Sequence, residues 1–349
     1  MTPDPDVIWY SRCPSPTASS IAIARGWLAR EFDGAGLAVR SLRAAGDRSV
    51  RQTHFTQQHD ALFRQGGIVP PLWAAAHGTA TRLIGVTEIP RFQGVISLPG
   101  IGIERPADLR GRRLALPRRT AEPVDFWRAH TWRGLLRALE LSGIAEDEVT
   151  WVDLPTDAPY HVTATHSLSA SLWTAREAAR LQTPEVLALV RGDVDAMYTY
   201  APTGVGLLEL LDAKVVVSLP PRGPDASGMG TLSVLTVSQR LLDDHPDVVV
   251  RYVRALLRAA DWAAEHQEET WRIFAAEEGV PEEWAAESFG GDSPLDLRPD
   301  LRPDLLLALQ HEANFLSGRG LIPAPVDVAA WSDPSPLRVA QELGQKEPA

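Results

Sequence analysis

The stretch DLRGRRLALP, residues 108–117, contains a short apolar run and leads into a helical pattern at 126–142. The segments TWVDL at 150–154 and DAMYTY at 195–200 have strand character, and a second helical pattern at 184–191 lies between them. Strands that alternate with helices are typical of a parallel or mixed sheet covered by helices. The middle of the chain is therefore predicted to form an α/β unit.

The first hundred residues show the same alternation. The apolar runs VIWY, LAVRSL and RLIGVTEI occupy 7–10, 37–42 and 82–89, and helical stretches at 18–30 and 71–76 lie between them. This pattern predicts a second α/β unit.

The chain returns to strand character after a Pro- and Gly-rich segment at 220–230. LSVLTVS at 232–238 follows that segment, and a long amphipathic helix begins after His245. A chain of 349 residues exceeds what one core usually fills, so we expect two lobes with a cleft between them. We predict one lobe from residues 1–97 and 220–349 and the other from 98–219, with LPGIGIERP at 98–106 as a connection between the lobes.

Composition excludes several classes of function. The formal charge of −11 disfavours a nucleic-acid partner or an anionic membrane, because either would need a basic face. One cysteine cannot form an intramolecular disulfide or a multi-thiolate metal site. The opening MTPDPDVIWYSR has no features of a signal peptide, and no stretch has about eighteen uninterrupted apolar residues. We expect a cytoplasmic, monomeric protein.

The single cysteine, Cys13, follows the first strand-like run and precedes the helical stretch that begins after Pro16. In open α/β sheets, ligands bind at the C-terminal edge of the strands, and a helix N-terminus there stabilises an anion or a thiolate. A lone cysteine is more often a small buried hydrophobe, so its position alone does not decide its role.

A second stretch, THFTQQHDALFRQGGIVPPLW at 53–73, contains His54, Arg64 and the pair Gly66-Gly67. Its weak periodicity predicts a loop. A neighbouring imidazole and guanidinium would favour a thiolate, and the arginine fork suits an oxyanion. Taken singly, each residue also fits an ordinary loop, turn or ion pair.

Metal and cofactor chemistry has weak support in the sequence. His161 and His166 have no accompanying carboxylate or thiol pattern, so we do not interpret them as a metal site. There is no Walker motif, zinc pattern or nucleophile elbow. We expect neither a metal nor a cofactor.

The order of the segments resembles a known architecture. DLRGRRLALP and RGDVDAMYTY, at 108–117 and 191–200, are similar to segments of solute-binding proteins of the nitrate, sulfonate and thiamine-precursor type. This resemblance implies a two-lobed, periplasmic-binding-protein-like α/β fold with a central cleft.

A more specific resemblance comes from the motifs YSRCP, HFT, R-GG and PPL, which are similar to the 2'-hydroxybiphenyl-2-sulfinate desulfinase family. It implies an enzyme that releases sulfite from an aromatic sulfinate without a cofactor. In the family, the cysteine, histidine and arginine of these motifs are the active-site residues. The resemblance therefore implies that Cys13, His54 and Arg64 are the active-site residues of this chain and that Gly66 and Gly67 lie at the sulfinate.

Two further residues are expected at the substrate, Phe55 of the HFT motif and Trp132 of FWRAHTWRGLL at 126–136. Trp127 is a second candidate for the aromatic residue that gates the site. Gln57 and His59 differ from the family pattern, so the contacts to the substrate's phenol ring are expected to differ.

Two routes remain open at this point. Cys13 attacks the sulfinate sulfur as a thiolate, or its S–H group protonates the ring carbon that carries the sulfur. The alternative to an enzyme is a solute-binding protein for an aromatic or sulfonate-like anion.

Overall fold

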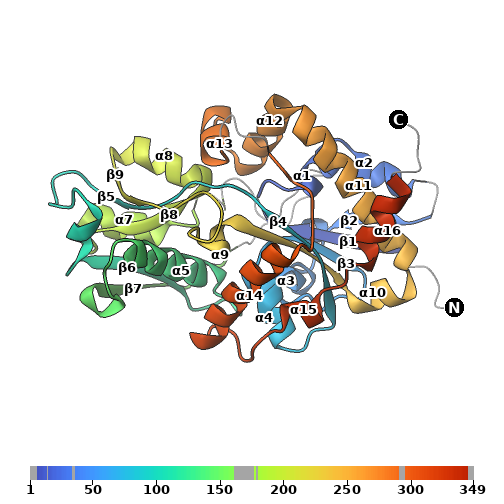
Figure 1. The fold of residues 1–349 in the computed structure, drawn as a ribbon, viewed down its shortest axis with the longest axis horizontal. Coiled ribbons are helices and arrows are strands. Elements are labelled where there is room, and N and C mark those ends of the chain that lie inside the picture. The colour runs from blue at the N-terminus through green and yellow to red at the C-terminus, as the bar shows by residue number, and fades with distance from the viewer. Residues whose placement is uncertain are drawn as a thin grey trace.

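The computed structural model describes residues 6–13, 15–33, 36–160, 177, 180–290 and 295–344. His161 and His166 lie outside the described residues. Two groups of strands, each with its own helices, lie side by side along the long axis of the molecule (Figure 1). This is the two-lobed α/β architecture that the sequence predicts.

The first lobe is built on a five-stranded sheet with the order β2-β1-β3-β10-β4. Its strands are β1 (Val7–Arg12), β2 (Ala38–Ser41), β3 (Leu62–Gly67), β4 (Thr81–Glu88) and β10 (Leu232–Ser238). β1 is parallel to β2 and β3, whereas β10 is antiparallel to both of its neighbours. Because β10 comes from the second half of the chain, this lobe is discontinuous in sequence.

Helices from both ends of the chain complete the first lobe. They are α1 (Ala18–Ala24), α2 (Trp27–Phe32), α3 (Arg48–Thr56), α4 (Val69–Ala76), α10 (Gln239–Asp244), α11 (Pro246–Glu265), α12 (Gln267–Glu278), α13 (Glu282–Ser288), α14 (Pro303–Gly318), α15 (Val328–Trp331) and α16 (Ser335–Gly344), with a 3-10 turn at Leu42–Ala44. The helix predicted at 18–30 is two helices, because Gly26 has a φ of 68° and starts α2 in a new direction.

The second lobe contains a three-stranded sheet, β8-β5-β9, and a parallel pair, β6-β7, which the bridge between Leu114 and Ala196 connects. Its elements are β5 (Gln93–Ser97), β6 (Arg113–Arg119), α5 (Phe126–Leu141), β7 (Thr150–Thr156), α7 (Thr183–Arg191), β8 (Met197–Tyr200), α8 (Ala201–Leu211) and β9 (Lys214–Ser218), with 3-10 turns at Pro106–Leu109 and Glu146–Glu148.

The first crossing between the lobes lies earlier than predicted. β5 pairs with β8 and β9, so residues 93–97 belong to the second lobe, and the chain crosses at 89–92. LPGIGIERP at 98–106 joins β5 to β6 inside that lobe and is not the connection between lobes. The pattern of an apolar run shows that it forms a strand but not which sheet it joins, which explains the error.

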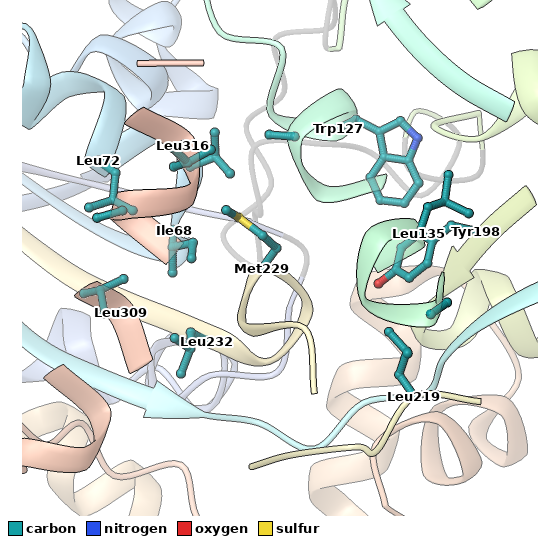
Figure 2. Packing of buried hydrophobic residues seen from close by; sticks show 14 of the residues in the cluster. Ile68, Leu72, Trp127, Leu135, Tyr198, Leu219, Met229, Leu232, Leu309 and Leu316 are labelled. Carbon is teal, nitrogen blue, oxygen red and sulfur yellow. The ribbon is translucent and has the colours of Figure 1, made fainter. Parts of the chain in front are cut away.

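A shared apolar cluster packs the lobes against each other. Helix α9 (Gly228–Thr231) carries Met229 between them. Figure 2 shows this side chain between Ile68 and Leu309 of the first lobe and Leu135 of the second. A separate cluster lies between the five-stranded sheet and α11. The junction beside Met229 is thus packed with apolar side chains, and this fixes the walls of the cleft.

The prediction of a loop at 53–73 is wrong. This stretch contains the end of α3, the whole of β3 and the start of α4. β3 lies between β1 and β10, so hydrogen bonds to both neighbours hold a strand whose sequence, LFRQGG, has little strand character. The reactive groups predicted there are therefore held on regular elements.

Candidate active site

Cys13 lies directly after β1, against the end of β3. Its backbone N–H donates to the carbonyl of Gln65 at 3.2 Å. Gly66 has a φ of 150°, and a Cβ atom at this position would lie 2.5 Å from the sulfur of Cys13. The close approach of the thiol to β3 therefore requires glycine at residue 66.

His54 reaches the thiol from the last turn of α3. Its Nε2 atom lies 3.7 Å from Cys13 Sγ, and its Nδ1 atom lies 2.7 Å from the hydroxyl of Ser11 on β1. The imidazole is fully buried. The ring of Phe55 packs edge-on against it, with centroids 4.9 Å apart. Contacts on both sides therefore fix the direction of the imidazole.

Arg64 reaches the same sulfur from β3. Its Nη2 atom lies 3.6 Å from Cys13 Sγ, and its Nε–H donates to the carbonyl of His54 at 3.3 Å. Burial lowers the pKa of this guanidinium, and the nearby Cys13 sulfur raises it. Among the described residues, the Nη1 atom has no hydrogen-bond partner although it is buried. This nitrogen is available to a ligand oxygen.

These groups open into a cavity that both lobes line. Cys13, His54 and Arg64 line it from the first lobe, and α4 contributes its N-terminal residues together with Gly67 and Ile68. No side chain caps α4. Pro70 and Pro71 have no backbone N–H, so in the first turn of α4 the N–H of Val69 and the helix dipole attract an anion. One end of the cavity therefore combines a thiol, an imidazole, a guanidinium and a helix N-terminus.

The second lobe and the crossing segments line the rest of the cavity. Its wall includes Phe126 and His130 of α5, Tyr200 at the end of β8, Thr203 of α8 and Met229. Burial lowers the pKa of His130 to about 3, so its imidazole is neutral at physiological pH. Most of this wall is apolar or aromatic, which suits an aromatic ligand.

The structure brings four of the predicted site residues to the cavity wall, namely Cys13, His54, Arg64 and Gly67. Gly66 lies behind them against Cys13. Phe55 does not line the cavity; it is buried between His54 and the ring of Phe126.

Trp132 is not brought to the cavity, contrary to the expectation. Its ring lies against the guanidinium groups of Arg128 and Arg319, 5.8 and 4.9 Å from their carbons. Phe126 and His130 are four residues apart and share the cavity face of α5, whereas Trp132 lies about a third of a turn from Phe126 and almost half a turn from His130. Helical periodicity would have selected Phe126 as the aromatic residue at the site.

The remaining sequence candidates also lie elsewhere. Trp127 is buried in the second lobe and donates to the carboxylate of Glu185. The side-chain oxygen of Gln57 accepts from Thr236, and His59 packs on Trp9. None of these side chains lines the cavity.

The described ranges contain no group of three or more metal-ligating side chains. Over the same ranges, no helix is both long and apolar enough to cross a membrane.

Comparison with known proteins identifies the chain. No family model matches it. The 2'-hydroxybiphenyl-2-sulfinate desulfinase of Rhodococcus erythropolis is 31% identical to it over 354 residues, which cover 94% of this chain and 92% of the relative. The chain belongs to this desulfinase family. It is therefore an enzyme that cleaves a carbon–sulfur bond, as the sequence resemblance predicts.

Solved structures agree with this assignment. The desulfurization enzyme DszB superimposes on the desulfinase with a TM-score of 0.78 and 28% identity, covering 97% of this chain and 100% of DszB. A cysteine-to-serine variant of DszB in complex with biphenyl-2-sulfinic acid gives a TM-score of 0.73, with 97% and 99% coverage. The sulfonate-binding protein SsuA from Methylobacillus flagellatus gives 0.71 at 16% identity over 97% and 95%, and it shows the shared fold alone.

Proposed function

We propose that this desulfinase hydrolyses an aryl sulfinate of the biphenyl-2-sulfinate type to the arene and sulfite, with Cys13 as the reacting group. The observation that carries the proposal is the convergence of His54 Nε2 and Arg64 Nη2 on Cys13 Sγ at 3.7 and 3.6 Å. Cysteine reactivity depends on the thiolate, and cationic or hydrogen-bonding neighbours stabilise it. The only thiol of the chain thus has the surroundings that a reactive cysteine needs.

The sulfinate binds at the Arg64 end of the cavity. The free Nη1 atom of Arg64 and the backbone N–H of Val69, the first residue of α4, offer donors to its two oxygens. The aryl rings then lie along the wall that includes Phe126 and Met229. DszB in complex with biphenyl-2-sulfinic acid supports a ligand of this class in the family.

The contacts of the sulfur favour attack on sulfur over protonation of carbon. Arg64 can only donate hydrogen bonds, so its Nη2–H at 3.6 Å stabilises a lone pair or a negative charge on Sγ. In this route the thiolate forms a bond to the sulfinate sulfur as the sulfur–aryl bond breaks. The aryl carbon takes a proton, which the hydrolysis step returns, and Cys13 is left as Cys–S–SO2⁻.

Water completes the reaction. It adds to the sulfur of the SO2 group, the S–S bond breaks, and hydrogen sulfite leaves with return of the Cys13 thiolate and release of a proton. The balance is ArSO2⁻ plus H2O giving ArH plus HSO3⁻, with no electrons exchanged with a cofactor. This makes the enzyme a hydrolase of carbon–sulfur bonds. Its cytoplasmic location and monomeric state stay predictions.

Incubation of the pure protein with biphenyl-2-sulfinate, followed by sulfite and biphenyl assays, tests the proposal. We expect equimolar products, and Cys13→Ser should lose turnover by several orders of magnitude while still binding the ligand. Rapid acid quenching should trap protein whose mass is increased by SO2. Sulfite release by Cys13→Ser at the normal rate would contradict the role of the thiol.

Thiol modification gives a second, independent measurement. Iodoacetamide should alkylate Cys13 and abolish sulfite release, and biphenyl-2-sulfinate should protect against both effects. Alkylation without loss of activity would show that the thiol is not the reacting group.

A further inference from the structure

The cavity has a second pair of polar side chains, Arg91 and Glu278, which the desulfination described above does not use. Arg91 lies on the segment that crosses between the lobes after β4, and Glu278 is the last residue of α12. Both side chains line the cavity that contains Cys13. Ser15 and the ring of Phe289 complete this part of the wall.

The Arg91 guanidinium is only partly paired. Its Nη2–H donates to the Ser15 hydroxyl, and the guanidinium carbon lies 5.9 Å from the centre of the Phe289 ring. The residue is 6% exposed, and within the described part of the chain its Nε–H has no hydrogen-bond acceptor. A buried donor without a partner costs free energy that a ligand oxygen recovers.

Glu278 is the matching group. No hydrogen bond to its carboxyl occurs within the described ranges, and the charges that act on it belong to Arg91, Arg12 and Glu277. Burial raises the pKa of Glu278 to about 8, so the carboxyl is mostly protonated at neutral pH. Tyr200 also faces this carboxyl, and burial raises the pKa of its phenol. Glu278 therefore offers one acceptor and one donor at neutral pH, and Arg91 offers donors only.

We propose that Arg91 and Glu278 form a specificity site that binds a hydroxyl group on the second ring of the aryl substrate. The hydroxyl oxygen accepts from Arg91, and its hydrogen is donated to the carbonyl oxygen of Glu278. A hydrocarbon ring at this position leaves both groups unpaired, and a site built to bind a hydroxyl rejects the analogue that lacks it. The inference rests on the proposed function, because it assumes that the sulfinate occupies the Arg64 end.

Ligand binding to Cys13→Ser, in which turnover does not interfere, tests this site. Three ligands are titrated by calorimetry at pH 7: 2'-hydroxybiphenyl-2-sulfinate, biphenyl-2-sulfinate and 2'-methylbiphenyl-2-sulfinate. The methyl compound controls for size. We expect the hydroxylated ligand to bind about tenfold more tightly than the other two, as one hydrogen bond to a charged group predicts.

The same titrations on double variants, in which Cys13→Ser is combined with Arg91→Met, Glu278→Leu or Thr203→Val, show which side chains bind the hydroxyl group of the ligand. Arg91→Met and Glu278→Leu should reduce the tenfold ratio to about one or two. Thr203 also lines the cavity, and Thr203→Val should leave the ratio unchanged. Thermal melting of each variant identifies any that does not fold, and either variant of the pair is sufficient for the test.

The outcomes distinguish failure of the specificity site from failure of the proposed function. Equal affinity for the three ligands in Cys13→Ser, or loss of the ratio in Thr203→Val alone, overturns the specificity site and leaves the desulfinase proposal intact. Failure of all three ligands to bind contradicts the proposed substrate class itself.

Discussion

The sulfur of Cys13 lies so close to Gly66 that a Cβ atom on this glycine would be only 2.5 Å away. Gly66 also has a φ of 150°, which side-chain-bearing residues rarely adopt, whereas a Cβ atom on the adjacent Gly67 would meet no atom within 4 Å. Of these two adjacent glycines of one strand, Gly66 alone must be glycine to make room for the thiol. Gly67 lines the cavity and has space for a side chain.

We predict that Gly66→Ala loses most sulfite release and lowers the free energy of unfolding by about 2–4 kcal/mol, from backbone strain and the clash with Cys13. Gly67→Ala is the matched control and should change the free energy of unfolding by less than about 1 kcal/mol. Urea unfolding and a sulfite assay of both variants measure these effects. Equal stability of the two variants would show that the thiol does not need the space at Gly66.

The charge on Arg64 is not sufficient for its predicted role. We predict that Arg64→Lys lowers kcat/KM by about 100-fold with the fold retained, because an ammonium cannot contact the thiol, the His54 carbonyl and a sulfinate oxygen together. Arg48→Lys, at the exposed first residue of α3, is the control. Steady-state kinetics with biphenyl-2-sulfinate provide the measurement. Similar kcat/KM values for both variants would show that the guanidinium geometry of Arg64 is not required.

Ser11 is a positioning residue that acts through His54. When the imidazole is charged, its Nδ1–H donates to the Ser11 hydroxyl and its Nε2–H points to the thiolate. We predict that Ser11→Ala slows alkylation of Cys13 by iodoacetamide at pH 7 by about tenfold, with a similar loss in kcat and little change in KM. The loss follows from removal of the hydroxyl that accepts a hydrogen bond from the charged ring.

Ser233→Ala is the control for Ser11. Its buried hydroxyl, on β10, has no hydrogen-bond partner in the described part of the chain. Alkylation of Ser233→Ala should proceed at the wild-type rate. If Ser11→Ala is also alkylated at that rate, His54 does not depend on Ser11 for its position.

Strands rich in apolar and β-branched residues could be predicted from the sequence alone. LSVLTVS at 232–238 is β10 from its first residue to its last, because all of its side chains are buried in the central sheet. β3 could not be predicted, since Arg64 and Gln65 are buried there by the strands on either side and not by a pattern of their own. Tertiary contacts determine that strand.

The candidate site also contains residues that could be predicted from the sequence and residues that could not. Cys13, His54 and Arg64 could be predicted because short motifs around them resemble a known family. Arg91 and Glu278 have no local motif, and only the folded chain brings the first crossing segment and the end of α12 to the wall of one cavity. Ser11 was missed because a serine in a strand gives no signal until α3 is folded against β1.

The raised pKa of Glu278 makes stability depend on pH. Its pKa is about 8 in the folded protein against 4.5 for the ordinary glutamate, so between these values the folded state binds more protons than the unfolded state. The contribution of this group to stability is therefore complete below pH 4.5 and is lost as the pH rises to about 8, by about 1.4 kcal/mol per pH unit.

We predict that Glu278→Gln, which cannot titrate, removes this contribution to the pH dependence of the free energy of unfolding. Urea unfolding of both proteins at pH 5.5, 6.5 and 7.5 measures the difference, which should grow in favour of the variant with pH. A constant difference across the three pH values would mean that Glu278 is already ionised in the folded enzyme, and that it faces Arg91 as a carboxylate.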